Sequence, residues 1–315
     1  MDKGRKSMVI VRLTGGLGNQ MFQYAAARRI AHVNGSQLKL DLNWFDEKGV
    51  WTPRKYELDV FSLPAAIADP VEILLLKSRR QNPVFRRLPA FLRSIVFHTK
   101  QTHIIEKQYA FDPQILMVSG NIYLEGYWQS CKYFEDIETI IRADFTFKDE
   151  MDDFNCTAAS SIQSCESVAV HIRRGDYVTL PSASSYHGHC PLQYYEKSIE
   201  YIQQHVRNPL FFVFSDDISW VRDNLAVDAP THYIDHKGQT AHSDMRLMSL
   251  CRHHIIANSS FSWWGAWLAV NPEKIVIAPG QWFSHSDNDT RDLIPEGWKR
   301  IITSNDIGTY QEPFE

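Results

Sequence analysis

Short apolar runs alternate with amphipathic stretches over most of the chain. Residues 8–13 form a β-branched run closed by glycines, and residues 37–42 form a second strand-like run. The apolar positions between these runs recur at helical spacing, at Phe22, Ala26, Ile30 and Val33. Strand, glycine turn, helix and strand in this order form a βαβ unit, which joins parallel strands. The beginning of the chain therefore predicts a parallel α/β sheet.

The same alternation resumes after a polar segment, residues 148–167, which is rich in Ser, Thr and Asp. Beyond it the pattern predicts strands at 168–172, 210–214, 255–257 and 274–278, and helices at 192–205, 244–254 and 261–270. A polar break between two α/β stretches favours a domain boundary. We therefore predict an α/β protein of two Rossmann-like domains, 1–150 and 151–315, that face a central cleft.

Composition narrows the class of protein. Of 315 residues, 44% are hydrophobic and 22% are charged, which is typical of a soluble globular protein. A net charge of −4 gives no reason to expect a nucleic-acid partner. The five cysteines form no CxxC pair, so neither a zinc site nor a disulfide framework is indicated. No apolar run is long enough to span a membrane, and we expect a cytoplasmic protein.

Residues 77–100 differ from the rest of the chain in charge. They include seven basic residues and no acidic one, with apolar residues interleaved. A solvated helical face over a core stripe accounts for this pattern, and so does a patch that meets anionic lipid head groups. The second interpretation predicts peripheral contact with the inner membrane.

The most informative polar residues follow the strand at 168–172. The sequence there is HIRRGD, with His171, Arg173, Arg174 and Asp176. Open α/β sheets bind ligands at this end of their strands. Guanidinium groups grip phosphate oxygens bidentately and stay charged, so adjacent arginines predict a diphosphate ligand. Fixed cations beside a leaving diphosphate would stabilise the transition state of a nucleotide-sugar reaction. Surface salt bridges are the alternative.

A second polar group ends the strand at 210–214. Ser215, Asp216 and Asp217 stand there, before a helix expected from about residue 218. A carboxylate at this place is suited to accept two hydrogen bonds from guanine, which would select a guanine nucleotide. It is equally suited to cap the helix, so both roles stay open.

A third group surrounds the start of the helix at 261–270, where hydroxyl and amide side chains precede three tryptophans. These residues are Asn258, Ser259, Ser260, Ser262, Trp263, Trp264 and Trp267. A helix start offers free N–H donors and a favourable field to phosphate. Tryptophans on a helix of Gly, Ala and Leu favour a place in the domain core.

The glycine-rich turn GGLGNQ follows the first strand. It resembles a dinucleotide fingerprint, but Met21 stands where that fingerprint needs Gly or Ala, and no GK[ST] follows. The turn therefore predicts close backbone approach to a ligand, with Asn19 and Gln20 as hydrogen-bonding groups. Residues 287–289 spell DxD, the ligand pattern of metal-dependent glycosyltransferases, but they lie in a polar segment that we interpret as a solvated loop.

Four segments together resemble glycosyltransferase family 11, the α-1,2-fucosyltransferases of bacteria and animals. They are GGLGNQMFQYAAARRIA, VAVHIRRGDYV, FFVFSDD and MSLCRHHIIANSSFSWWGAWLA, in the order of the family, from Val9 to Ala269. The resemblance implies a GT-B-like fold, GDP-β-L-fucose as donor, transfer with inversion, and no metal or other cofactor.

The resemblance also implies roles for single residues. The donor-binding residues that it implies are His171, Arg173, Arg174, Asp216, Asp217, Ser260, Ser262 and Asn19. Arg173 would bind the β-phosphate with Arg174 nearby, and His171 would contact guanine. Ser260 or Ser262 would contact a phosphate. Asn19 and Gln20 would lie on the acceptor side, in an N-terminal acceptor domain.

The reaction so implied is a single displacement, in which the 2-hydroxyl of a terminal β-galactose attacks fucose C1. Arg173 would be catalytic together with Asp176, our candidate base, which alternatively only orients an arginine. The expected partners are GDP-fucose and a galactose-terminated oligosaccharide or glycolipid, in the synthesis of surface polysaccharide such as O-antigen. A fucosyltransferase of another linkage or acceptor is one alternative, and a non-catalytic sugar-binding protein, suggested by the tryptophans, is another.

Overall fold

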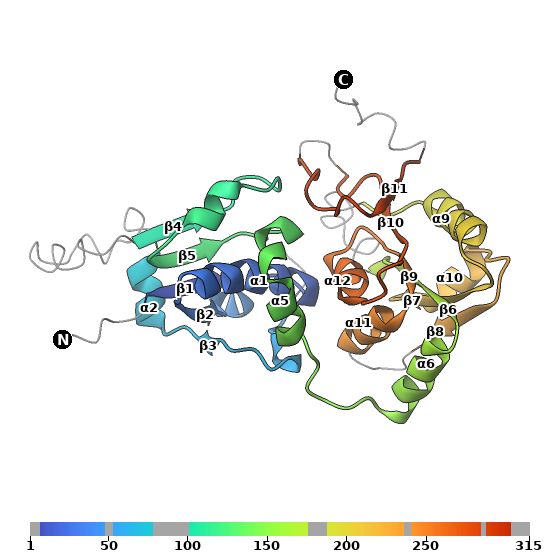
Figure 1. Cartoon of the computed structure of the whole chain (residues 1–315), viewed down its shortest axis with the longest axis horizontal. Helices are drawn as coiled ribbons and strands as arrows, with labels where there is room; N and C mark the ends of the chain where they lie inside the picture. Colours follow the sequence, from blue (N-terminus) through green and yellow to red (C-terminus); the bar gives the residue numbers. More distant parts are fainter. Residues whose placement is uncertain are drawn as a thin grey trace, which may run out of the picture. The chain divides into compact units, whose positions relative to one another are not determined.

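Two compact units make up the protein (Figure 1). The computed structural model describes residues 7–47, 53–77, 101–175, 188–235, 241–284 and 288–303. Unit 1 comprises residues 1–148 and 291–293, and unit 2 comprises residues 149–290 and 294–315. Each unit is built on a parallel sheet of its own.

Unit 1 has a five-stranded parallel sheet in the order β3-β2-β1-β5-β4. Its strands are β1 (Met8–Arg12), β2 (Gln37–Asp41), β3 (Ala66–Ile67), β4 (Gln101–Ile105) and β5 (Asn121–Glu125). The chain runs from β1 outward to β3, crosses to the edge strand β4 and then comes inward to β5, so β1 and β5 are neighbours although the strand order does not reverse between them. Open parallel sheets bind ligands at the carboxyl ends of their strands, above all where the strand order reverses.

The helices of unit 1 follow from its apolar pattern. They are α1 (Leu17–Val33), α2 (Pro70–Leu76) and α5 (Glu138–Asp144), with 3-10 turns η1 (Asn43–Asp46), η2 (Leu58–Val60), η3 (Pro113–Met117), η4 (Cys131–Tyr133) and η5 (Glu135–Ile137). The predicted apolar face of α1 is buried at Phe22, Ala26 and Ile30, but Val33, the last residue of the helix, is 55% exposed. Helix α2 packs Ile73 against the sheet residue Ile10.

Unit 2 has a six-stranded parallel sheet in the order β11-β10-β9-β6-β7-β8. Its strands are β6 (Glu166–Ile172), β7 (Pro209–Ser215), β8 (Thr231–Ile234), β9 (His253–Ile255), β10 (Val276–Pro279) and β11 (Lys299–Ile301). The chain runs from β6 through β7 to β8 and then crosses to β9 on the other side of β6. The reversal point of unit 2 therefore lies between β6 and β9.

The helices of unit 2 are α6 (Asp153–Gln163), α9 (Leu192–His205), α10 (Ile218–Asn224), α11 (Ala241–Leu250) and α12 (Ser260–Leu268). The predicted helix 192–205 coincides with α9, whose residues Ile199 and Ile202 pack against the buried β6 core. The three tryptophans of α12 are buried and contact one another, so the prediction that they lie in the core is confirmed.

One local prediction was wrong, and two elements were not predicted. The helix predicted at 244–254 ends at Leu250, and His253 begins a strand, because β6 and β10 flank this segment and satisfy its backbone on both sides. The edge strand β11 was not predicted, since its sequence KRI is charged and pairs on one side only. The polar segment 148–167 contains α6, which Asp152 caps and whose Ile162 is fully buried.

No helix in the described part of the chain has the length and apolar character needed to cross a membrane. Residues 78–100, which carry almost all of the basic stretch, lie outside the described residues, and so does Asp176. The predicted lipid contact of that stretch stays a prediction.

Candidate functional site

The carboxyl ends of β6, β7 and β9 bring three of the predicted polar groups to one edge of the unit 2 sheet. These strands are neighbours in the order β9-β6-β7, and all pairings are parallel. In register, His171 on β6 lies opposite Phe214 on β7, so the segments that follow the two strands start side by side. The segment after β9 leads into the start of α12. This edge, at the reversal point of unit 2, is the candidate functional site.

Asp216 holds the loop that carries the two arginines. One carboxylate oxygen, Oδ2, lies 2.9 Å from Nη1 of Arg173, and the other, Oδ1, accepts a hydrogen bond from the backbone N–H of Arg174 at 2.9 Å. A Cβ on Gly175 would lie 2.5 Å from Oδ2 of Asp216, so only glycine allows this approach. Asp216 thus positions Arg173. Its predicted contact with guanine stays a prediction.

Arg174 is held by a different set of contacts. Its guanidinium lies 3.4 Å from the ring centroid of Trp220, and its Nε lies 3.6 Å from Oδ2 of Asp217. Asp217 is also the N-cap of α10, because its Oδ1 accepts a hydrogen bond from the backbone N–H of Trp220 at 3.1 Å. The capping role that we left open for the two acids therefore belongs to Asp217. Trp220 was missed by the sequence analysis, and its only signal was its place three residues after that cap.

His171 lies under this edge, with its ring 5.6 Å from that of Phe261 in the first turn of α12. Burial lowers the pKa of His171 to about 4, with Arg173 acting in the same direction and Asp216 against it. The imidazole is therefore neutral near pH 7. Its Nδ1 is buried and has no hydrogen-bond partner among the described residues. A neutral imidazole can donate or accept at such an atom, and its contact with guanine stays a prediction.

The hydroxyls at the start of α12 differ in what they can reach. Ser259 is the N-cap, and its Oγ accepts a hydrogen bond from the backbone N–H of Phe261 at 3.3 Å. The Ser262 hydroxyl is buried and donates to backbone carbonyl oxygens, of which that of Ser259 is 3.3 Å away. Ser260 is half-buried. The phosphate contacts of Ser260 and Ser262 stay predictions, and the geometry favours Ser260.

Asn19 and Gln20 belong to unit 1, at the start of α1. Gln20 is fully buried, and its Nε2 donates to the carbonyl oxygens of Gly15 and Lys55, both at 2.9 Å. Its Oε1 accepts from the backbone N–H of Glu57 at 2.9 Å. The amide of Gln20 thus fastens the glycine turn to a neighbouring segment. The acceptor-side roles of both residues stay predictions.

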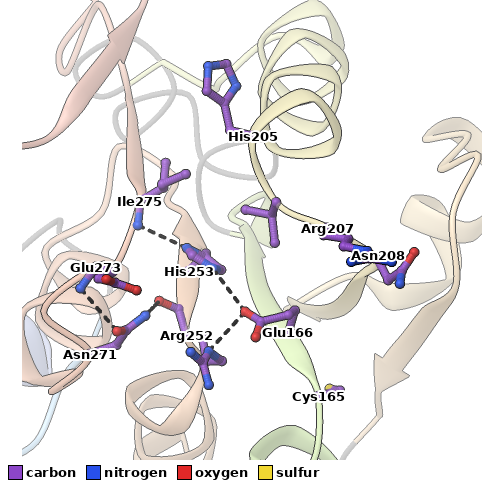
Figure 2. Close-up of a pocket in the computed structure, with 11 residues that line it drawn as sticks. Cys165, Glu166, His205, Arg207, Asn208, Arg252, His253, Asn271, Glu273 and Ile275 are labelled. Carbon is purple, nitrogen blue, oxygen red and sulfur yellow. Dashed lines mark hydrogen bonds and ion pairs between the residues drawn. The ribbon is translucent and has the colours of Figure 1, made fainter.

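A pocket of about 690 Å³ lies at the opposite, amino-terminal edge of the unit 2 sheet (Figure 2). Glu166 pairs there with Arg252 at 3.0 Å and with Nε2 of His253 at 3.5 Å. Nδ1 of His253 accepts from the backbone N–H of Ile275 at 3.1 Å. This edge lies away from the carboxyl ends of the strands, where open α/β sheets bind ligands, so we do not assign the candidate site to the pocket.

Metal-binding clusters were also considered. The described residues contain no group of three or more His, Cys, Asp or Glu side chains arranged to hold a metal ion. Asp287 of the DxD motif lies outside the described residues. The absence of a metal requirement therefore stays a prediction.

Comparisons with known proteins agree on one family. Residues 92–301 match the family described as Glycosyl transferase family 11. The chain is 34% identical to an alpha-1,2-colitosyltransferase of Escherichia coli, over 94% of this chain and 99% of that protein. It is also 34% identical to the O-antigen biosynthesis glycosyltransferase WbnK of Escherichia coli, over 91% and 98%. Identity to galactoside alpha-(1,2)-fucosyltransferase 2 of Sus scrofa is 24%, over 87% and 73%.

A solved structure shares the fold. The crystal structure of NodZ alpha-1,6-fucosyltransferase soaked with GDP-fucose superposes with a TM-score of 0.50 at 16% identity, over 87% of this chain and 95% of that one. The predicted fold class, GT-B-like with two parallel-sheet α/β domains, is confirmed.

Proposed function

The chain belongs to glycosyltransferase family 11, and we propose that it transfers L-fucose from GDP-β-L-fucose to the 2-hydroxyl of a terminal β-galactose, with inversion. The similarity to a glycosyltransferase named for O-antigen biosynthesis supports a surface-polysaccharide acceptor. The alternative of a non-catalytic sugar-binding protein is set aside, because the chain belongs to an enzyme family and the three tryptophans of α12 lie in the core.

One observation carries the proposal: two guanidinium groups are fixed at the reversal point of unit 2. Arg173 is oriented by Asp216, and Arg174 lies between Trp220 and Asp217. Cations held in place before the reaction need little reorganisation as charge develops on a leaving group, so they stabilise the transition state more than the ground state. A nucleoside diphosphate is the leaving group that matches a pair of arginines.

In the proposed mechanism, the acceptor hydroxyl attacks C1 of fucose while the bond between C1 and the diphosphate oxygen breaks. Arg173 receives the charge that develops on the β-phosphate, and His171, which is neutral, contacts the guanine. Because the arginines supply the positive charge at the leaving group, we propose that no metal is needed.

A second candidate donor has a specific observation in its favour. The identity to the colitosyltransferase is 34%, whereas that to the Sus scrofa fucosyltransferase is 24%. Colitose is L-fucose without its 3-hydroxyl, so a GDP-linked colitose would present the same diphosphate and nucleoside to unit 2 as GDP-fucose does. The arginines cannot tell them apart, and the difference must be decided at the sugar.

The experiment is turnover of GDP-fucose and GDP-colitose against a panel of terminal β-galactosides, with and without EDTA. We expect transfer of fucose, a product whose linkage by NMR is α-1,2, and equal rates with EDTA. A preference for GDP-colitose would show that colitose, and not fucose, is the sugar that the enzyme transfers. Another linkage would refute the proposed acceptor hydroxyl, and loss of activity in EDTA would refute metal independence.

A further inference from the structure

The carboxyl ends of the neighbouring strands β1, β5 and β4 of unit 1 also gather polar groups. Nε2 of Gln129, which follows β5, donates a hydrogen bond to Oδ1 of Asn19, which follows β1, at 2.8 Å. Two backbone positions here lie in the left-handed region, Gly15 with φ +74° and Trp128 with φ +55°. For a tryptophan this conformation is strained, and such strain concentrates at binding and catalytic sites.

Glu106, which follows β4, is built into this edge. Its Oε2 accepts a hydrogen bond from the backbone N–H of Tyr127 at 2.6 Å, and its Oε1 accepts one from that of Trp128 at 2.9 Å. A Cβ on Gly126 would lie 2.3 Å from Cβ of Glu106, so a side chain there would push the carboxylate away. The loop after β5 therefore fixes a half-buried carboxylate, which remains partly accessible to solvent.

The side chains of two consecutive residues at this edge each carry a polar atom without a hydrogen-bond partner among the described residues. These atoms, Nε1 of Trp128 and Oε1 of Gln129, are buried. Buried polar atoms in proteins are nearly always paired with protein, water or ligand, so a donor and an acceptor left over together point to an unrecorded partner. A hydroxyl group can satisfy both kinds of atom, because it donates and accepts.

The aromatic side chains at this edge suit a sugar ring. The rings of Tyr109 and Tyr127 are stacked, with centroids 6.2 Å apart and planes 16° apart, and Tyr127 is 37% exposed. Their planar apolar faces complement the C–H face of a pyranose, and Glu106 would repel an anionic ligand. A neutral pyranoside fits these groups better than a phosphate or a carboxylic acid.

We propose that this edge of unit 1 binds the terminal sugar of the acceptor, a neutral pyranoside, and that Glu106 takes the proton of its attacking hydroxyl. The inference rests on the transferase function proposed above. The hydroxyl oxygen forms a bond to C1 of the donor sugar while the bond from C1 to the diphosphate breaks. The electron pair of that bond leaves with the nucleoside diphosphate, and the proton passes to the Glu106 carboxylate. On this proposal Glu106, and not Asp176, is the base.

The ionisation of Glu106 agrees with this role. Burial raises the pKa of Glu106 to about 7, and the hydrogen bonds from Tyr127 and Trp128 act in the opposite direction. A general base works best when its pKa lies near the working pH. Since the deprotonated form is the active one, the rate should rise as pH increases through about 7.

Two titratable groups around Glu106 have pKa values that lie away from 7. Tyr133 of η4 interacts with Glu106, but burial first of all raises its pKa to about 12, so it stays neutral. Glu125 at the end of β5 is paired with Arg12 at 2.6 Å and with His103 at 3.0 Å, and its pKa is lowered. Two further acids, Asp112 and Asp292, act on Tyr133, and Asp292 is paired with Lys132 at 2.6 Å.

The test compares Glu106→Gln with a matched control, Glu138→Gln, which removes an exposed carboxylate of unit 1 that pairs with Arg142. We expect Glu106→Gln to lower kcat by about 100-fold or more, the usual contribution of a general base. It should leave the KM for the nucleotide sugar and the affinity for GDP within about 2-fold, and remove the rise of kcat/KM through about pH 7. The control should keep all four quantities. A Glu106→Gln enzyme that keeps kcat and the pH profile overturns the role of the carboxylate.

A second variant and a binding measurement keep the site testable whatever Glu106→Gln does to folding. Gln129→Met keeps the length of the side chain and removes its polar atoms, so the KM for the acceptor should rise about 10-fold while that for the donor stays. Binding of methyl β-D-galactopyranoside, followed by saturation-transfer NMR without donor, should be lost in both variants. If the wild type binds the galactoside but turns over no donor, the proposed function is refuted and the sugar-binding site is still supported. Unchanged galactoside binding by both variants would overturn the site alone.

Discussion

Unit 2 reverses its strand order between β6 and β9, whereas in unit 1 the order runs in the same sense on both sides of the junction between β1 and β5. The reversal point of unit 2 presents two cations, and carboxylates hold them: Asp216 orients Arg173, and Asp217 pairs with Arg174. The carboxyl edge of the unit 1 sheet presents one carboxylate, that of Glu106 after β4, and backbone N–H groups hold it. The topology sets where a ligand is bound, whereas the side chains set which ligand it is.

The difference matches the two substrates of a glycosyl transfer. A nucleoside diphosphate is an anion that gains charge at one bond as the donor is cleaved, so fixed arginines favour its departure. An acceptor sugar is neutral and must lose a proton, so a fixed carboxylate favours its attack. In both sites the charged group is oriented before a ligand arrives, by contacts within its own unit.

Arg173→Ala should have the largest effect on the unit 2 site. We expect kcat to fall by about 1000-fold, because fixed arginines at a leaving phosphate contribute on this scale. The measurement is single-turnover transfer from GDP-fucose. Arg252→Ala is the matched control, since Arg252 also pairs with a carboxylate of unit 2, Glu166, at 3.0 Å, but at the opposite edge of the sheet. Near-normal turnover by Arg173→Ala would contradict the phosphate role of the arginine.

Gly175→Ala should have a smaller effect by displacing the carboxylate that orients Arg173. The added Cβ would meet Oδ2 of Asp216 at 2.5 Å, so the carboxylate must move. We expect kcat to fall by about 30-fold, and the double variant with Asp216→Ala to be no slower than the slower single one, because the two changes act through one contact. Gly297→Ala, where an added Cβ meets nothing within 4 Å, should behave as wild type. If the losses in kcat add in the double variant, Gly175 and Asp216 act through different contacts.

Trp220→Leu should lower kcat by about 10-fold, since the stack of Trp220 on Arg174 restricts the guanidinium. Trp220→Phe keeps an aromatic face and should restore most of the rate. Tyr233→Leu is the matched control, because it removes a similar stack, with Arg222 at 4.1 Å from the ring centroid. A loss in Trp220→Phe equal to that in Trp220→Leu would mean that stacking is not what Trp220 supplies.

The unit 2 site could be predicted in outline from the sequence, because its parts follow three strands and parallel strands end at one edge. His171, Arg173 and Asp216 needed only the recognition of β6 and β7 as strands. Trp220 could not be predicted, since its stack on Arg174 depends on how Asp217 turns the chain into α10.

The unit 1 site was less accessible to sequence reasoning. Glu106 lies about twenty residues before the loop that holds it, and nothing near it in sequence marks its partners, Tyr127 and Trp128. Its place becomes visible only when β4 and β5 are paired, with Ile105 opposite Glu125. The strand β9 was misjudged for the same reason: its pairing on both sides outweighs the helical spacing of the residues before it.

A substitution of Gln20 tests whether this residue contacts the acceptor or only supports the site. Of the changes described, it should have the smallest effect on rate. The buried amide makes three hydrogen bonds to the backbone. Gln20→Leu would leave these backbone groups unpaired, so we expect the free energy of unfolding to fall by about 3 kcal/mol. The KM for the acceptor should change by less than about 3-fold under conditions in which the protein is folded. Gln203→Leu, which removes one exposed hydrogen bond to the carbonyl of Asp228, should alter neither quantity. Denaturant unfolding measures the stability, and titration of the acceptor measures the KM. A higher KM for the acceptor at unchanged stability would support direct contact between Gln20 and the acceptor.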